Sequence, residues 1–343
     1  MLKRIVPALA LLVLLSGMDY LGSRQAEDSK AIGNVRYEIV LFESPLDPEG
    51  SRALLESAFA RIEKAVAALG DGPGTALARL NAAKTGTAVP LDADAFELLS
   101  RALAVARLTD GYFDVTDGDV RRLWSEARAK NEPPPDATIE TALPKARYDA
   151  ILLDPESRTA TVRRAGFRID WGTLVRARAL DAAAELLRDR GVTSALLSAG
   201  DDLRLLGRCR EASAWRVGVD HPRRVDRYAA VLELSDGMAV STVSDAEDFF
   251  IHRGKRYAAF YDHRSGRARD NEIASVVLRA KDSVTARALG EALFAMGPVK
   301  GFTLLEGLRA EGAGALCIEE KKGEDLVISG SDDMTPHLKD IRL

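Results

Sequence analysis

The sequence has few of the side chains that form disulfides or bind zinc. It contains 2 cysteines and 4 histidines among 343 residues. Cys209 and Cys317 cannot build a disulfide framework, and no CxxC or HExxH spacing suggests a zinc site. If a metal ion is bound, we therefore expect oxygen ligands, which favours magnesium or calcium.

The chain also lacks an excess of charge of one sign. Its 48 lysines and arginines stand against 52 aspartates and glutamates, for a formal net charge of -4. This balance argues against a dedicated nucleic-acid-binding protein, because such proteins usually carry a net basic face. The hydrophobic content of 46% excludes global disorder. The length allows one large domain, or two domains of roughly 150 residues each.

A long apolar run stands at the N-terminus. Ile5–Leu15 is uninterrupted and follows Lys3 and Arg4. The run is shorter than the roughly 20 residues of a membrane span, but it has the pattern of a secretory signal. Leu15–Met18 resembles a lipoprotein processing box in which Met18 replaces the lipidated cysteine, so lipidation there is chemically impossible. We predict that residues 1–25 are a signal peptide or weak membrane anchor, and that the protein is periplasmic or inner-membrane-associated. The alternative is a buried N-terminal helix.

The rest of the chain mixes helix and strand patterns without a regular βα alternation, which predicts an α+β fold. Helical spacing of apolar residues predicts helices over 51–69, 94–109, 175–189, 283–296 and 299–311. A hairpin is expected over 148–163, around Asp154–Ser157. Further strands are expected over 35–42, 194–198, 215–220, 229–234, 238–242, 257–261, 273–278 and 315–319.

Two aspartates stand at helix or strand ends, where either of two roles is open. Asp114, in the run Gly111–Thr116, would bind a ligand or serve as a turn or cap residue. Asp170 lies between a strand end and a helix start, where backbone N–H groups favour anions such as phosphate. It would equally serve as a simple cap. The small-residue turn Ser198–Asp202 either lets a ligand approach the backbone or only joins two strands.

Two further groups of charged residues also have two interpretations. Asp262–Gly266 contains His263, which is suited to a general-base role or is only an exposed, solvated residue in a charged turn. Arg287 and Glu291 stand four residues apart on a predicted helix. By themselves they read as a surface pair of opposite charge.

Six segments, in a fixed order, carry a resemblance to a known family. They are Gly111–Trp124 (GYFDVTDGDVRRLW), Ile169–Asp181 (IDWGTLVRARALD), Ala195–Gly207 (ALLSAGDDLRLLG), Trp215 with Asp220 and Pro222, Tyr257–Gly266, and Thr285–Gly297 (TARALGEALFAMG). Together they resemble the motifs of the ApbE family, the FAD:protein FMN transferases. The resemblance runs from about Val35 to about Gly330.

The resemblance implies a fold and an activity. The expected fold is ApbE-like and T-fold-related, with mixed sheets, packed helices and a single interlocked unit over residues 30–343. Members of the family bind FAD with Mg²⁺ at the pyrophosphate, transfer FMN to a threonine of a flavin-accepting redox protein, and release AMP. The family's FAD-binding positions correspond here to Tyr112, Phe113, Asp114, Asp170, Arg176, Asp262 and Arg264. Its metal-binding positions correspond to Thr173 and to the helix that carries Arg287 and Glu291.

This sequence departs from the family pattern at the positions that the family uses for metal binding and reaction. Arg287 stands where the family has a metal-binding aspartate, and Glu291 stands where it has a threonine. Either the ion is absent, or Glu291 coordinates it from a shifted position. Arg287 would itself be able to replace the charge of the metal, because guanidinium pairs well with phosphate. Ala259 replaces the family's histidine, and Asp201 replaces a glycine.

Three hypotheses follow. The first is an active flavin transferase with an altered metal site. The second is an exported, non-catalytic protein that binds a flavin, a nucleotide or a protein partner on the same scaffold. The third is a structural remnant without a ligand.

Overall fold

The computed structural model describes residues 25–145, 147–208, 214–225, 227–234, 237–246, 248–321 and 326–343. The predicted signal peptide or anchor thus lies outside the described residues apart from Gln25, as does Cys209. Cys317 is buried. In the described part of the chain, no helix is both long and apolar enough to cross a membrane.

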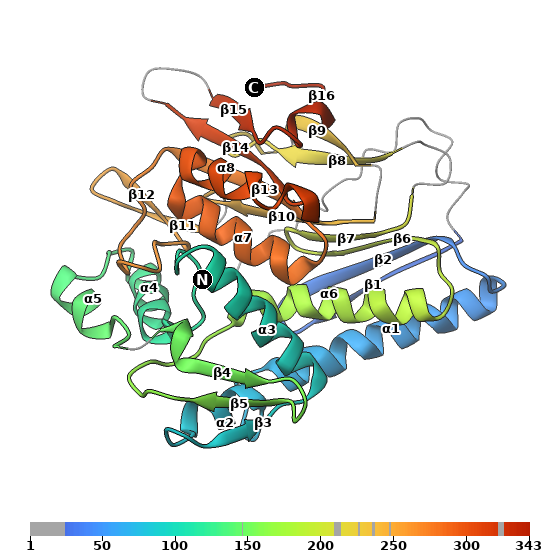
Figure 1. The fold of residues 1–343 in the computed structure, drawn as a ribbon. Coiled ribbons are helices and arrows are strands. Elements are labelled where there is room, and N and C mark those ends of the chain that lie inside the picture. Colours follow the sequence, from blue (N-terminus) through green and yellow to red (C-terminus); the bar gives the residue numbers. More distant parts are fainter. Residues whose placement is uncertain are drawn as a thin grey trace.

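A large antiparallel sheet forms the centre of the molecule (Figure 1). Its strands lie in the order β1, β2, β6, β7, β10, β13, β14, β15, and each neighbouring pair is antiparallel. Their bounds are Ala26–Ile32, Val35–Glu43, Ser194–Ala199, Asp202–Leu206, Ala239–Ser244, Ile273–Ala280, Gly314–Glu320 and Leu326–Gly330. Strand β13 is buried along its whole length because both faces of the sheet are covered.

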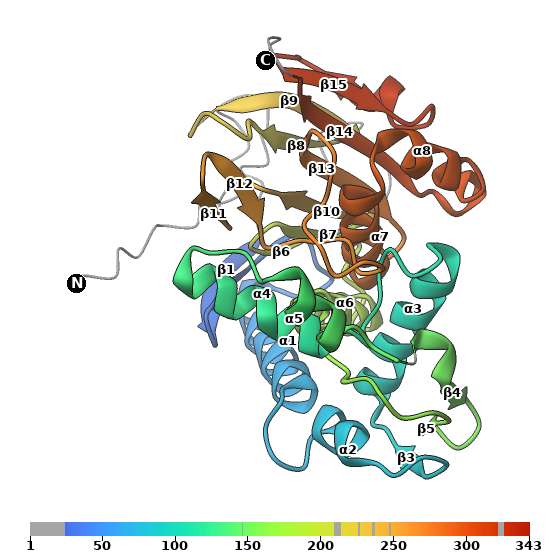
Figure 2. The same cartoon turned by 90° about the vertical axis from the view of Figure 1, so that its left-hand side faces the viewer.

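Helices cover one face of this sheet. α1 (Pro48–Leu69) packs beside α6 (Gly172–Asp189), and α6 packs beside α7 (Ser283–Met296), which lies on β10 and β13. α8 (Pro298–Glu306) follows α7. Short strands cover the other face: β8 (Trp215–Asp220), β9 (Tyr228–Leu234) and β16 (Leu338–Lys339) form a small sheet. Figure 2 shows β8 and β9 at the same end of the molecule as β14 and β15.

A smaller part of the chain packs against the helices. It contains α2 (Ala76–Ala82), α3 (Ala93–Leu108) and a sheet of β3 (Ala88–Pro90), β5 (Thr159–Val162) and β4 (Ile151–Asp154). Figure 2 shows the β3–β5–β4 sheet at the opposite end from β8 and β9. A third group lies at one side, with α4 (Gly118–Lys130), α5 (Asp136–Ala142), β11 (Phe249–His252) and β12 (Lys255–Ala258).

A buried ion cluster ties three of the helices together. Asp94, at the start of α3, accepts hydrogen bonds from Arg61 of α1 (2.6 and 2.8 Å) and lies 3.0 Å from Arg178 of α6. Burial by itself would raise the pKa of Asp94, but the two guanidinium groups outweigh it and lower that pKa. This cluster joins three helices whose residues are far apart in the sequence.

Most predicted elements are present, with differences at their ends. α8 ends at Glu306, and only a short 3-10 helix covers Arg309–Glu311, because Gly307 separates the two. The hairpin begins with a 3-10 turn at Tyr148–Ala150 rather than with a strand. The elements β1, β3, β7, β11, β15, β16, α2, α4 and α5 were not predicted. The burial pattern of β1 shows why, because this edge strand has no fully buried residue and therefore no clear alternation.

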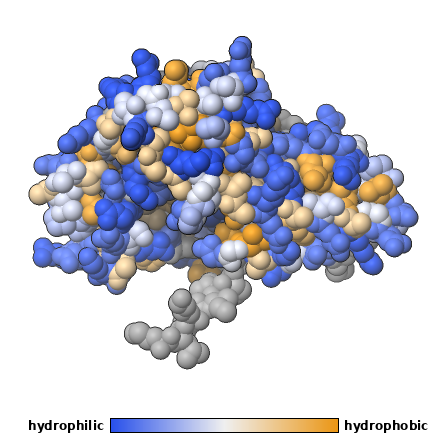
Figure 3. All heavy atoms as spheres, turned by 90° about the horizontal axis from the view of Figure 1, so that it is seen from below, coloured by the Kyte–Doolittle hydropathy of each residue, from blue (hydrophilic) through white to orange (hydrophobic). Residues whose placement is uncertain are grey.

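The surface has no large apolar face on the side drawn in Figure 3, where apolar residues form separate small patches among hydrophilic ones. Scattered apolar side chains of this kind are normal on a protein surface. A ligand site is therefore expected in the cavities and among the buried charges of the protein.

Candidate functional site

Two cavities share lining residues at the first turn of α6. One, of about 550 Å³, lies between the start of β2, the loop after α1 and residues 168–176. The other, of about 400 Å³, lies between α4, the end of β10 and residues 259–260. Thr173 and Arg176 line both cavities. We call the two together the cleft.

The backbone at this junction is suited to an anion. Trp171 is the N-cap residue of α6, and its indole donates to the carbonyl of Leu69 (2.8 Å) rather than capping the helix. Asp170 accepts from the N–H of Gly172 (2.8 Å). The N–H of Leu174 donates to the carbonyl of Trp171 (2.8 Å), and the positive end of the helix dipole favours negative charge. Asp170 closes the turn that precedes the helix and also lines the cleft.

The start of α4 is held tightly against the same segment. A β-carbon at Gly118 would lie 2.8 Å from the carbonyl oxygen of Arg168, so only glycine allows this approach. The contact places Arg121, on the next turn of α4, in the cleft. Arg121 and Arg176 expose 20% and 24% of their side chains, enough to contact a ligand while most of each chain is held by the protein.

A buried ion cluster lies beneath Arg176. Oδ1 of Asp202 accepts from Arg287 (2.6 and 3.0 Å) and from the hydroxyl of Ser241 (2.7 Å). Oδ2 accepts from Nε of Arg176 (2.5 Å). Burial would raise the pKa of Asp202, but Arg287 and Arg176 keep it below its usual value. We call these four residues the Arg287 cluster.

The prediction that Arg287 and Glu291 form a surface pair is wrong. Arg287 is 0% exposed and Glu291 is 1% exposed, because α7 is covered by the sheet on one side and by α6 and α3 on others. Arg287 binds Asp202, whereas Glu291 accepts from the hydroxyl of Thr173 (2.6 Å). The two side chains therefore serve separate partners.

Glu291 has further neighbours on its other oxygen. Oε2 is buried and accepts no hydrogen bond within the described residues. It lies 3.9 Å from Nη2 of Arg121 and 4.0 Å from Nε2 of His263. Glu291 is thus surrounded by one hydroxyl donor and two basic side chains, which stabilise a buried carboxylate.

His263 is buried, at 2% exposure, so the interpretation as a solvated turn residue is wrong. Its Nδ1 lies 2.8 Å from Oδ2 of Asp117, which also accepts from the hydroxyl of Tyr261 (2.8 Å). Burial would lower the pKa of His263, but the charge of Asp117 outweighs it and raises that pKa. His263 packs against the rings of Tyr261 and Phe113, and Trp124 holds this turn in place by stacking on Tyr261 and donating to the carbonyl of Gly266 (2.8 Å).

The magnesium ion that the resemblance implies does not fit these residues. Within the described ranges, no group of three or more His, Cys, Asp or Glu side chains comes together to hold a metal ion. Thr173 and Glu291 do lie together, but they bond to each other, and Glu291 already has Arg121 and His263 beside it. The guanidinium of Arg287 stands at the position expected for a carboxylate, and it would repel a cation.

The other predicted FAD-binding residues do not line the cleft. They lie in the Gly111–Thr116 segment and in the Asp262–Gly266 turn. Phe113 and Asp114 are 0% exposed. Asp114 serves as the predicted turn residue, because its Oδ1 accepts from the backbone N–H (2.9 Å) and the hydroxyl (2.8 Å) of Thr116. Its Oδ2 accepts from Arg147 (3.2 Å), and Asp114 does not line the cleft. Burial raises the pKa of Asp114. Asp262 closes its own turn by accepting from the backbone N–H of Arg264 (2.9 Å).

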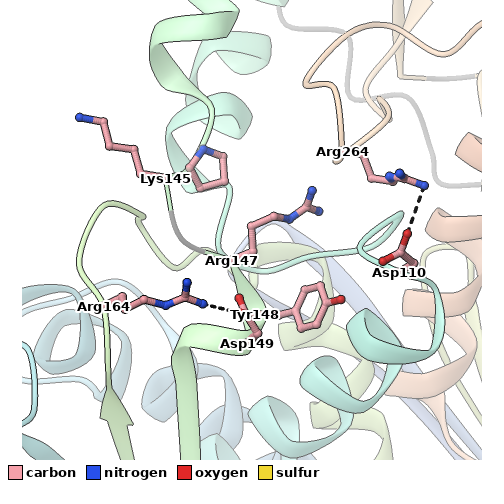
Figure 4. Close-up of a pocket in the computed structure, with 8 residues that line it drawn as sticks. Asp110, Lys145, Arg147, Tyr148, Asp149, Arg164 and Arg264 are labelled. Atoms are coloured by element: carbon pink, nitrogen blue, oxygen red, sulfur yellow. Dashed lines mark hydrogen bonds and ion pairs between the residues drawn. The ribbon is translucent and has the colours of Figure 1, made fainter.

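Tyr112 and Arg264 contact each other, with the guanidinium 4.9 Å from the ring centre. Arg264 also borders a third cavity of about 380 Å³, opposite Asp110 (Figure 4). Its other lining residues are Pro144, Lys145, Arg147, Tyr148, Asp149 and Arg164. Among the described residues, none that lines this cavity also lines the cleft. The structure thus brings Asp170, Thr173 and Arg176 together, and places Tyr112 and Arg264 elsewhere.

Sequence reasoning missed two residues of the site. Arg121 lines the cleft and Asp117 pairs with His263. Both stand in the segment Gly111–Trp124, of which only Tyr112, Phe113 and Asp114 were predicted to belong to the site. Their partners Glu291 and His263 are more than a hundred positions away in the sequence.

Comparison with known proteins identifies the family. The model of the ApbE family matches residues 34–316, so the chain belongs to the ApbE family. It is similar to the FAD:protein FMN transferase of Haemophilus influenzae, with 27% identity over 230 residues, 65% of this chain and 66% of that protein. The corresponding protein of Treponema pallidum is 28% identical over 244 residues, 67% of each chain. The chain thus spans about two thirds of the length of these relatives.

Solved structures agree with the fold. The ApbE protein of Thermotoga maritima has a TM-score of 0.77 and 26% identity, covering 91% of this chain and 98% of that one. The flavin transferase ApbE of Vibrio cholerae has a TM-score of 0.76 at 21% identity, covering 91% and 98%, and at this identity it supports the fold alone. The predicted family and the predicted α+β class are both confirmed.

Proposed function

We propose that this chain binds FAD in the cleft. The observation that carries the proposal is the pair of cavities at the N-terminus of α6, which share Thr173 and Arg176 as lining residues. A dinucleotide has an anionic centre and two bulky ends. Its pyrophosphate would lie at the helix N-terminus, and one end would enter each cavity, whose volumes lie in the range of ordinary ligand sites.

Arg121 and Arg176 support this placement. Both guanidinium groups face the cleft from opposite elements, α4 and α6. Guanidinium forms paired hydrogen bonds to phosphate oxygens, so the two would bind the pyrophosphate from two sides.

A titration of the purified full chain tests FAD binding. Flavin fluorescence, read directly for FAD and FMN and by displacement of FAD for AMP, should show that FAD binds more tightly than FMN or AMP alone, because each of these fills one cavity only. Arg176→Met should weaken binding by about tenfold or more. Arg188→Met, an exposed residue near the end of the same helix, is the matched control and should change nothing. Equal binding by Arg176→Met and the control would contradict the proposed site.

A second candidate function is transfer of FMN from FAD to a threonine of a flavin-accepting redox protein. Family membership and the names of the relatives favour it. In such a transfer the threonine oxygen attacks the FMN phosphorus and AMP leaves, so the work of the protein is positioning and charge neutralisation. Arg121 and Arg176 are placed to do both. Ala259, which lines the cleft where the family motif has histidine, offers no base.

An acceptor assay separates the two functions. The full chain is incubated with FAD and a flavin-accepting redox domain, and covalent flavin and free AMP are measured. Transfer is supported if both appear together and both disappear in Arg176→Met. FAD binding without either product leaves the chain a binding protein.

We also propose that residues 1–25 direct the chain to the periplasm or the inner membrane. The basic start and the apolar run Ile5–Leu15 support this. Cell fractionation should find the full chain outside the cytoplasm, and a chain lacking residues 1–25 inside it. Equal distribution of the two would refute the proposal.

A further inference from the structure

We infer that the cleft takes its fixed positive charge from Arg287 and needs no divalent cation to bind FAD. The inference deepens the proposed FAD site and rests on it. It starts from the Arg287 cluster, in which one carboxylate, Asp202, is shared by two guanidinium groups.

The cluster carries one net positive charge. Asp202 contributes one negative charge, and Arg287 and Arg176 contribute one positive charge each. Arg287 and Asp202 are both 0% exposed, so neither reaches a ligand. Arg176 is the member that lines the cleft, with 24% of its side chain exposed. The surplus charge is therefore presented to the cleft through Arg176.

Arg287 is a positioning residue in this arrangement. It occupies Oδ1 of Asp202 together with Ser241, which leaves Oδ2 to hold Nε of Arg176. The terminal nitrogens of Arg176 remain directed at the cleft, where Asp201 lies 3.6 Å away but is itself 54% exposed to water. Without Arg287, Asp202 would neutralise Arg176 and the cleft would lose its surplus.

An acidic side chain at position 287 would change the net charge of the Arg287 cluster from positive to negative. It would lie beside Asp202 in a buried space, and two carboxylates at close range need a cation between them. Glu291, the acidic residue of α7, already has Thr173, Arg121 and His263 around it. The residues thus point to a built-in cation in place of a bound one.

FAD binding with and without magnesium tests the inference. For the full chain, the dissociation constant in EDTA and in millimolar Mg²⁺ should agree within about threefold. Arg287→Asp should weaken binding in EDTA by about tenfold or more and recover part of it with Mg²⁺. Arg287→Lys keeps the charge and should bind independently of the ion. Arg188→Asp, on the exposed surface of α6, makes the same change of charge and should have no effect.

A second measurement does not depend on FAD. Thermal unfolding of the full chain should be unchanged by Mg²⁺, whereas a saturable rise in the melting temperature would overturn the inference. Tightening of FAD binding by about tenfold with Mg²⁺ would overturn it as well. If FAD fails to bind in either buffer, the proposed function fails. The effect of Mg²⁺ alone then still decides whether an ion site exists.

Discussion

Replacing Arg287 with methionine should destabilise the protein through the carboxylate that it leaves behind. Asp202 is 0% exposed and would lose two of its hydrogen bonds, at 2.6 and 3.0 Å. Breaking a buried ion pair by removing one partner costs about 3–5 kcal/mol. Because Arg176 and Ser241 remain on Asp202, we expect a cost near the lower end, about 3 kcal/mol.

The reverse change should cost more. Asp202→Asn leaves Arg287 fully buried without a counter-charge, so we expect about 4–5 kcal/mol. Together the two changes remove both charges, and their joint cost should fall short of the sum by about 2–3 kcal/mol. Urea unfolding at pH 7, followed by circular dichroism and by tryptophan fluorescence, measures the four corners of this cycle. Arg188→Met serves as the surface control.

The outcome that would refute this reasoning is a coupling below about 0.5 kcal/mol between positions 287 and 202. Such a result would mean that the two side chains do not depend on each other. The buried Arg287 cluster would then not be the structural unit that the distances describe.

Three further predictions concern the neighbouring buried charges. Asp117 raises the pKa of His263, so the stabilisation from this pair is complete below about pH 6.5 and is lost as the pH rises through the raised pKa. Unfolding midpoints measured against pH should show this loss in the unchanged protein and a flatter profile in His263→Gln. Thr173→Val removes the hydroxyl that donates to Glu291 (2.6 Å) and should cost about 1.5–3 kcal/mol in urea unfolding, whereas Thr173→Ser should cost far less. The pKa of Asp94 is lowered, so its stabilisation is present above about pH 4 and lost on acidification; Asp94→Asn should lower stability at pH 7 and flatten the acid side of the same profile.

Periodicity along the chain predicted the helices well. Ser283–Met296 was expected as a helix that ends at Gly297, and α7 has those bounds. The apolar residues of these helices recur at helical spacing because one face of each must be buried. α4 was missed although Val120, Trp124 and Ala127 recur at helical spacing, because only four of its thirteen residues are buried and most of the others are polar.

The order of short motifs predicted the family before any contact was known. The structure explains why two of the motifs accompany each other. Trp124, which ends the first, donates to Gly266, which ends the Tyr257–Gly266 turn. Each motif therefore supplies one of the two residues of this hydrogen bond, and neither motif by itself indicates which residue the other partner is.

The sequence by itself determined the composition of the site. It showed that an arginine, and not an acid, stands at position 287, and that Glu291 and Thr173 accompany it. Tertiary structure alone decided what these residues do. Spacing of four places Arg287 and Glu291 on one face of a helix, but it does not tell whether that face meets water or protein. Because β10, β13 and α6 cover it, the same two charges are buried and must find other partners. The resulting bonds to Asp202 and Thr173, across 85 and 118 residues of sequence, are products of the fold.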